Sequence, residues 1–174
     1  MKFFMLDSAH IVSEYVNIDN ELYDIESNCR CSKIQLIPKE IPPVELKDES
    51  GDIWPDFMYE SGLPLISKRF KDFLDDEKIE NLFYKEITLK RVKKGDEKKY
   101  WLAIPPKIKC LGKGTVFDEV FGSVEHFEID EKRIGYYNIF RCENPSNPEI
   151  ILTESFAEKL KAQNFEGVYT FPLK

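Results

Sequence analysis

The chain contains few residues of the types that usually carry out catalysis. Its two histidines, His10 and His126, are separated by most of the sequence, and His126 lies in the alternating segment 124–128, on the same side as Glu128. A histidine beside a carboxylate can act as a general base. Strand histidines exposed between acidic residues are far more common than catalytic ones, so the sequence favours a solvent-exposed position for His126.

Four cysteines, Cys29, Cys31, Cys110 and Cys142, could supply the four thiolates of a structural zinc site. The first two have the spacing C-x-C instead of the C-x2-C that most such sites use, and the other two stand singly among strand-forming residues. The pattern favours independent buried or half-exposed thiols in a reducing compartment. A zinc site is the open alternative and disulfides are less expected, so no metal and no cofactor is predicted.

The segment Gly112-Lys113-Gly114-Thr115 has the glycines, lysine and hydroxyl found at the end of a phosphate-binding loop. Lys107 occupies the position of the earlier glycine that such a loop needs, and no helical pattern follows. A turn between strands therefore explains the segment better. Hydrolase motifs are also absent, so we predict no catalytic residue and no enzyme activity.

The composition is that of a globular protein with a sheet-rich core. Hydrophobic residues make up 42% and aromatic residues 13% of the 174-residue chain, which can bury a core without disulfides. The formal net charge of −7 argues against a nucleic-acid partner and favours a basic protein partner. No apolar run is long enough to span a membrane, and Asp7 interrupts the apolar N-terminus too early for a signal peptide. We therefore expect a cytoplasmic protein that does not bind membranes.

The first helix is expected over residues 68–74. Ser67 is a favourable N-cap, and Phe70, Phe73 and Leu74 have the spacing of one apolar face. The segment before it, 54–67, combines two prolines, a glycine and three aromatic residues without helical or strand periodicity. It is too apolar for a solvated loop, so we expect an irregular but packed segment that leads into the helix.

Alternation and turn residues predict a hairpin that pairs 83–91 with 100–104 around a polar turn. Thr153 is expected to cap a second helix, Asn164 to end it in the left-handed conformation, and 167–171 to form the last strand. Short strands are expected at 2–6, 11–18, 32–37, 108–111, 123–129, 136–141 and 149–152, and a strand–turn–strand at 128–134.

The proline-rich residues 38–53 form the expected seam between a strand-rich N-terminal part, 1–53, and a main body, 54–174. The predicted fold is a single α+β domain, a largely antiparallel sheet with two or three short helices packed on one side. The expected core residues are Phe57, Leu65, Phe70, Phe73, Leu74, Ile87, Leu89, Trp101, Leu102, Ile104, Ile139, Phe140, Ile151, Phe156, Leu160, Val168 and Phe171.

Four short motifs follow one another along the main body. These are Pro-Asp-Phe at 55–57, Gly-Leu-Pro-Leu-Ile-Ser at 62–67, Ile-Ile-Leu-Thr-Glu-Ser-Phe at 150–156 and Gly-Val-Tyr-Thr-Phe at 167–171. The series resembles a bacterial family that was first catalogued as a domain of unknown function and later grouped with the immunity proteins of polymorphic toxin systems. The resemblance covers 54–174, and residues 1–53 match more loosely. It implies a cytoplasmic protein made beside a toxin, which binds and blocks that toxin.

The leading hypothesis is therefore an immunity protein that neutralises a cognate toxin domain, expected to be basic, by stoichiometric binding. The resemblance assigns no catalytic residue. From the acidic charge we predict partner contacts at Asp72, Asp75, Asp76 and Glu77, with Tyr59 as an exposed aromatic contact. The alternative is a small-ligand or regulatory binding module of a bacterial defence or signalling system, which would need a deep apolar pocket with a few convergent polar groups.

Overall fold

The computed structural model describes residues 1–8, 14–16, 22, 33–46, 51–60, 63–143 and 149–173. The chain divides into two compact units that are interleaved in sequence. Unit 1 consists of Met1–Asp7, Pro105–Asn164 and Tyr169–Lys174, and unit 2 consists of Ser8–Ile104 and Phe165–Val168. The proline-rich residues 38–53, expected to be a seam, lie within unit 2.

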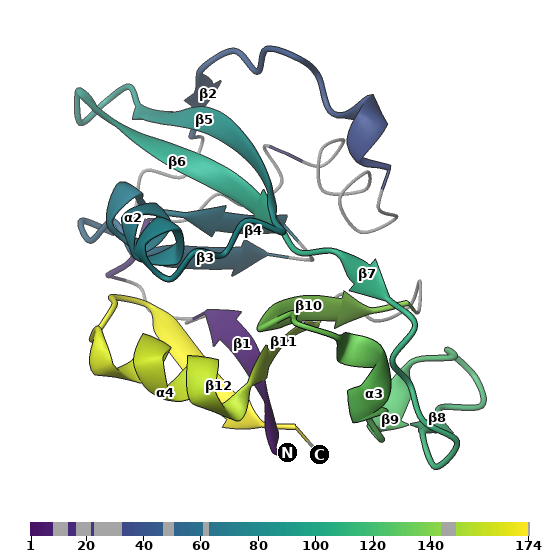
Figure 1. The fold of residues 1–174 in the computed structure, drawn as a ribbon. Coiled ribbons are helices and arrows are strands. Elements are labelled where there is room, and N and C mark those ends of the chain that lie inside the picture. The colour runs from purple at the N-terminus through teal and green to yellow at the C-terminus, as the bar shows by residue number, and fades with distance from the viewer. Residues whose placement is uncertain are drawn as a thin grey trace. The chain divides into compact units, whose positions relative to one another are not determined.

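Unit 2 contains a five-stranded sheet (Figure 1). Its strand order is β2 (Val44–Glu45), β5 (Phe83–Arg91), β6 (Asp96–Ile104), β4 (Leu63–Ile66) and β3 (Phe57–Glu60). Only β2 and β5 pair in parallel, and the other neighbours are antiparallel. The hairpin predicted from alternation is the β5–β6 pair, which extends over nine residues in each strand.

The prediction of an irregular segment over 54–67 is wrong, because β3 and β4 form a second hairpin there. Pro64 of β4, which lies opposite Tyr59, is unusual in an interior strand because proline has no N–H to donate. The Tyr59 N–H donates to the Ser8 hydroxyl, and that hydroxyl donates to the Tyr59 carbonyl. Since Tyr59 directs both backbone groups away from β4, its pair with Pro64 is a non-hydrogen-bonded one. The N–H that proline lacks is therefore not needed on this side.

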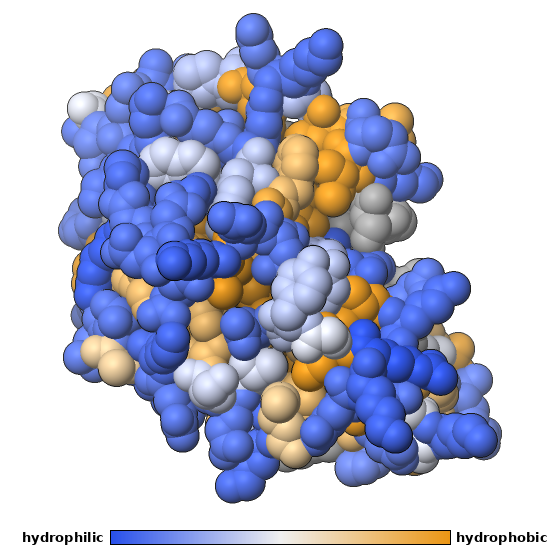
Figure 2. Space-filling model, in the orientation of Figure 1, coloured by the Kyte–Doolittle hydropathy of each residue, from blue (hydrophilic) through white to orange (hydrophobic). Residues whose placement is uncertain are grey.

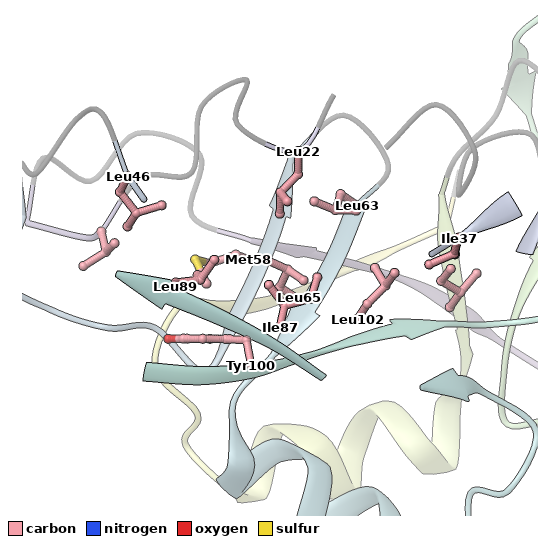
Figure 3. Close-up of a cluster of buried hydrophobic side chains, with 12 residues drawn as sticks. Leu22, Ile37, Leu46, Met58, Leu63, Leu65, Ile87, Leu89, Tyr100 and Leu102 are labelled. Carbon is pink, nitrogen blue, oxygen red and sulfur yellow. The ribbon is translucent and has the colours of Figure 1, made fainter. Parts of the chain in front are cut away.

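One face of the unit 2 sheet carries a cluster of buried apolar side chains (Figure 3). Leu65 of β4 lies directly opposite Leu102 of β6, and Ile87 of β5 faces the same side. Leu22 and Leu46, from the chain before β3, cover these strands. The buried members are Val16, Leu22, Ile37, Leu46, Met58, Leu63, Leu65, Ile87, Leu89, Tyr100, Leu102 and Ile104.

The first helix, α2 (Lys68–Asp76), begins where the sequence predicts. The Ser67 hydroxyl accepts a hydrogen bond from the Phe70 N–H at 3.2 Å, which satisfies one of the free donors of the first turn. Phe70, Phe73 and Leu74 are buried, as their spacing indicated. The ring of Phe70 packs edge-on against Phe57 of β3, with 5.9 Å between centroids.

The second five-stranded sheet belongs mainly to unit 1. Its strand order is β12 (Val168–Pro172), β1 (Phe3–Ser8), β11 (Ile150–Thr153), β10 (Ile139–Cys142) and β7 (Lys107–Ile108). The strands β1, β11 and β10 pair in antiparallel register, whereas β7 joins β10 in parallel. Both β10 and β11 are buried along their whole length, so they form the centre of this unit.

Helix α4 (Glu154–Ala162) follows β11, as predicted. Thr153 holds the N-cap position, but its hydroxyl donates to Asn138 Oδ1 at 3.0 Å and makes no capping hydrogen bond. Asn164 has a φ of 49°, which confirms the predicted left-handed residue after the helix.

Two sequence predictions of strands are wrong. The segment 128–134 contains the short helix α3 (Glu131–Ile134), because Asp130 Oδ1 accepts a hydrogen bond from the Lys132 N–H and caps it. Within 32–37, the 3-10 helix η1 (Ile34–Leu36) replaces the expected strand. A small hairpin, β8 (Val116–Phe117) and β9 (Val124–His126), occupies part of 115–129.

The α+β class with largely antiparallel strands is confirmed, with two sheets in place of one and three α-helices in the part of the chain described. Most predicted core residues are buried; the exceptions are Phe171, which is 47% exposed, and Trp101 and Val168, which are half-buried. Among the described residues, no helix is long and apolar enough to cross a membrane.

We expect Leu65→Ala to lower the free energy of unfolding of unit 2 by about 2–5 kcal/mol, because it opens a cavity in a fully buried position. Both tryptophans, Trp54 and Trp101, belong to unit 2, so urea unfolding followed by tryptophan fluorescence reports on this unit. Val92→Ala, at a site that is 60% exposed, is the matched control and should change the value by less than about 0.5 kcal/mol. Equal losses in the two variants would contradict the assigned core.

Candidate partner-binding surface

The Pro-Asp-Phe motif, Ser67 and the residue before Gly167 meet at the carboxylate of Asp56, which is buried. Its Oδ1 accepts a hydrogen bond from Ser67 Oγ at 2.5 Å. Its Oδ2 accepts from Arg69 Nη1 at 3.0 Å and from the Glu166 N–H at 2.9 Å. The Asp56 N–H donates to the Glu166 carbonyl, and the Asp56 carbonyl accepts from the Ser67 N–H. One residue thus joins the start of β3, the first turn of α2 and the segment Phe165–Val168.

Side-chain packing strengthens the same junction. The ring of Phe165 stacks on Phe70 with 4.8 Å between centroids, and the Arg69 guanidinium lies 4.6 Å above the Phe165 ring. Gly167 has a φ of +74°, and a Cβ there would come within 2.8 Å of Pro55 Cβ. Both the backbone conformation and the close approach require glycine at this position. The motif residues around Asp56 are therefore occupied by internal contacts.

A second cluster holds Trp54 against the β5–β6 hairpin. Arg91, which is 5% exposed, donates from Nε to Asp96 Oδ1 at 2.8 Å and from Nη2 to Oδ2. Trp54 Nε1 donates to Asp96 Oδ2 at 3.2 Å, and its ring lies 4.9 Å from the Arg91 guanidinium. The hydrogen bonds from Arg91 lower the pKa of Asp96 to about 2, and the bond from Trp54 adds to this effect.

The expectation that Tyr59 is an exposed aromatic contact is wrong. Its side chain is buried on β3, where the ring stacks on Phe57 with 5.8 Å between centroids. Glu77 is half-buried at the C-terminal cap of α2, and its N–H donates to the Phe73 carbonyl. Of the five predicted contacts, the three aspartates of α2 are thus the exposed ones.

Asp72, Asp75 and Asp76 are exposed on or at the end of α2. Two of them form ion pairs one helical turn apart, Lys68 with Asp72 and Lys71 with Asp75. Hydrophilic side chains cover most of the face shown in Figure 2. Since the lysines of α2 offset its aspartates, the surface of this helix has mixed charge, and its role in partner binding stays a prediction.

Only some of the residues with possible catalytic or metal chemistry lie in the described part of the chain. His126 is exposed on β9, whereas His10, Cys29 and Cys31 lie outside the described residues. Within the described ranges, no group of three or more histidine, cysteine, aspartate or glutamate side chains could hold a metal ion.

Cys110 and Cys142 are not the independent thiols that their separation in sequence indicated. Both are buried, and their Sγ atoms are 3.2 Å apart, at hydrogen-bond distance. The parallel pairing of β10 with β7 places Cys142 beside Ile108, two residues before Cys110. The hydrogen bond between the thiols lowers the pKa of Cys110. The same bond, together with burial, raises the pKa of Cys142.

The glycine-rich segment at 112–115 is a turn, as predicted, with the Thr115 N–H donating to the Gly112 carbonyl. The Glu128 carboxylate lies over both glycines, so that a Cβ on Gly114 would be 1.9 Å from Glu128 Oε2. A carboxylate in this position would repel a phosphate. The turn therefore does not form a phosphate-binding loop.

Two surface depressions bear on the small-ligand alternative. One, of about 630 Å³, is lined by residues 39–43 with Lys85 and Glu86. The other, of about 590 Å³, is lined by the start of β1, the segment 127–131 and the end of β12. Both are open to solvent and neither is a deep apolar pocket.

Sequence reasoning missed the apolar residues that the β8–β9 hairpin exposes. Val120 and Phe121 are 80% and 77% exposed, and Val116 and Phe117 are about half exposed. The sequence does contain an indication of this surface. Two apolar pairs, Val116-Phe117 and Val120-Phe121, flank the charged pair Asp118-Glu119.

Comparison with protein-family models finds no match for this chain, and comparison with curated proteins finds none either. The resemblance to immunity proteins therefore depends on the motif residues alone.

We expect Asp56→Ala to lower the free energy of unfolding by about 2–4 kcal/mol, because it leaves the Glu166 N–H and the Ser67 hydroxyl without their acceptor. Urea unfolding with tryptophan fluorescence measures this value. Asp72→Ala removes an exposed carboxylate that is also ion-paired, and it should change the value by less than about 1 kcal/mol. Similar values for the two variants would show that Asp56 does not hold the junction.

The low pKa of Asp96 predicts a specific dependence of stability on pH. Because folding lowers this pKa to about 2 from an ordinary value of 3.8, the ionised carboxylate stabilises the folded protein above about pH 4. That stabilisation is lost as the pH falls through 2. Wild type should therefore be more stable than Asp96→Asn at pH 7, and the difference between their urea midpoints should shrink between pH 4 and 2. A difference that stays constant over this range would contradict the assignment.

Proposed function

We propose that this chain is an immunity protein, which binds a cognate bacterial toxin domain and blocks it in a stoichiometric complex. The observation that carries the proposal is the meeting of separate motif segments at Asp56. Asp56, in Pro-Asp-Phe, bonds to Ser67 in the next motif and to the Glu166 N–H, just before the distant Gly167.

The charge of the chain supports the same proposal. Its formal net charge is −7, and an acidic inhibitor associates faster with a basic toxin domain through electrostatic attraction. Blocking by stoichiometric binding needs no catalytic group in the inhibitor. The partner's identity and its reaction then depend on the toxin and not on this chain.

The contacts of the motif residues also limit where a partner can bind. Asp56 is buried, Ser67 is engaged with it, and Trp54 is held by Arg91 and Asp96. Residues used in this way maintain the fold and are not available to a partner. Selectivity for one toxin must therefore come from exposed residues other than these three.

The test is a co-expression rescue in a bacterial host. The C-terminal domain of the large open reading frame adjacent to this gene is induced with and without the chain. We expect the chain to relieve the toxicity of that domain and to co-elute with it from gel filtration. Because the proposal is binding and not catalysis, titration of the purified toxin domain should end at a fixed molar ratio.

An unrelated bacterial toxin domain of similar size and charge serves as the control and should stay toxic. Relief of both toxins would point to a general effect on the host. Toxicity of the adjacent domain that the chain leaves unchanged would overturn the proposal, and the small-ligand module would then be examined by a thermal-shift screen.

A further inference from the structure

The β8–β9 hairpin, residues 116–126, belongs to unit 1 (Figure 1). Its tip exposes more apolar surface than a solvated turn needs. Val116 pairs with His126 and Phe117 with Val124, and the chain between these pairs forms the tip. Val120 and Phe121 at the tip are 80% and 77% exposed. Adjacent large apolar side chains exposed to this degree are typical of an interaction site.

The tip is held in a defined conformation by Asp118. Its Oδ1 accepts hydrogen bonds from the Val120 N–H at 2.9 Å and from the Phe121 N–H at 2.5 Å. The Asp118 N–H donates to the Ser123 carbonyl and its carbonyl accepts from the Gly122 N–H, which closes the turn. Gly122 supplies the positive φ of 65° that this closure requires. A turn ordered in this way loses little conformational freedom when a partner binds.

The charges around the tip specify the kind of partner. The segment 113–128 contains four carboxylates, Asp118, Glu119, Glu125 and Glu128, against one lysine, Lys113, and one histidine, His126. Three of these acids are exposed and Asp118 is half-buried. An apolar tip with an acidic rim fits a pocket that is apolar at its centre and basic at its edge.

We propose that the tip of this hairpin is the anchor for the toxin domain, with Phe121 and Val120 in an apolar pocket and the surrounding acids facing basic side chains. This inference rests on the proposed function. It places the main contact on unit 1, whereas the acidic residues predicted from sequence lie on α2 in unit 2. An aromatic side chain at the centre of an interface contributes more to affinity than charged residues at its edge.

The same charges disfavour other occupants of the tip. Bacterial membranes carry anionic lipids, and the carboxylates beside Phe121 would be repelled by them. A second copy of this chain would bring the same acidic tip and the same net charge of −7 to the contact. A basic protein surface is the occupant that the tip's charge complements.

The experiment compares exposed apolar residues on two turns. Val120→Ser and Phe121→Ser are combined in one variant, and Val92→Ser, at a 60% exposed site after β5, is the control. The probe is the inactivated C-terminal domain of the adjacent open reading frame, immobilised for kinetic binding measurements. We expect the double variant to bind about 30-fold or more weakly, mainly through faster dissociation, and the control to bind like wild type. The thermal midpoint of the double variant should stay at the wild-type value, because neither side chain is buried.

A second pair of variants separates the two candidate surfaces. Glu119→Lys with Glu125→Lys should slow association and weaken its dependence on salt, since exposed charges mainly steer the encounter. Charge reversal of Asp72, Asp75 and Asp76 on α2 should have a smaller effect on the dissociation rate than the double variant at the tip.

The outcomes distinguish the two proposals. If wild type binds the probe and the double variant binds within twofold of it, the tip is not the anchor and the immunity function stands. A large loss on reversal of the α2 charges, with the tip variants unaffected, would move the interface to α2. If wild type does not bind the probe, both proposals are overturned, because the anchor depends on the function.

Discussion

The buried carboxylate of Asp56 joins the start of β3 to the first turn of α2 and to the distant Glu166. Its oxygens accept hydrogen bonds from Ser67, Arg69 and the Glu166 N–H, so every segment at the junction supplies a donor. A buried carboxylate without such donors would be strongly destabilising, and so would donors without the carboxylate. This mutual requirement fixes α2 against β3, and α2 in turn places Phe70 between Phe57 and Phe165. The packing of Phe57, Phe70 and Phe165 and the position of Arg69 over the Phe165 ring depend on this placement of α2.

Local patterns predicted the elements that depend on local physics. The β5–β6 hairpin follows from alternation and turn residues, Ser67 caps α2 through its hydroxyl, and Asn164 adopts a positive φ. The β3–β4 hairpin could not be predicted in the same way, because Pro64 normally argues against an interior strand. Pro64 is tolerated because its pair with Tyr59 is a non-hydrogen-bonded one, in which the backbone groups of Tyr59 contact Ser8, from a distant part of the chain.

The properties of the candidate site also depend on contacts that a local sequence pattern does not show. Acidic residues can be found in a sequence, but the ion pairs of Asp72 and Asp75 with lysines of the same helix decide how acidic the surface is. Tyr59 was predicted as an exposed contact because interfaces favour tyrosine, but it lies on β3 with its ring stacked on Phe57 and buried. The contact between Cys110 and Cys142 depends on the parallel pairing of β7 with β10, which no pattern near either cysteine reveals.

The interleaving of the two units has a consequence for biosynthesis. Strand β1 lies between β12 and β11, so both of its neighbours come from the C-terminal part of the chain. A ribosome makes β1 before both of its partners. Until β11 and β12 have been made, the apolar residues Phe3–Leu6 have no strand to pair with, and an unpaired apolar strand is prone to aggregate. Unit 1 can complete its sheet only after these two late strands have been synthesised.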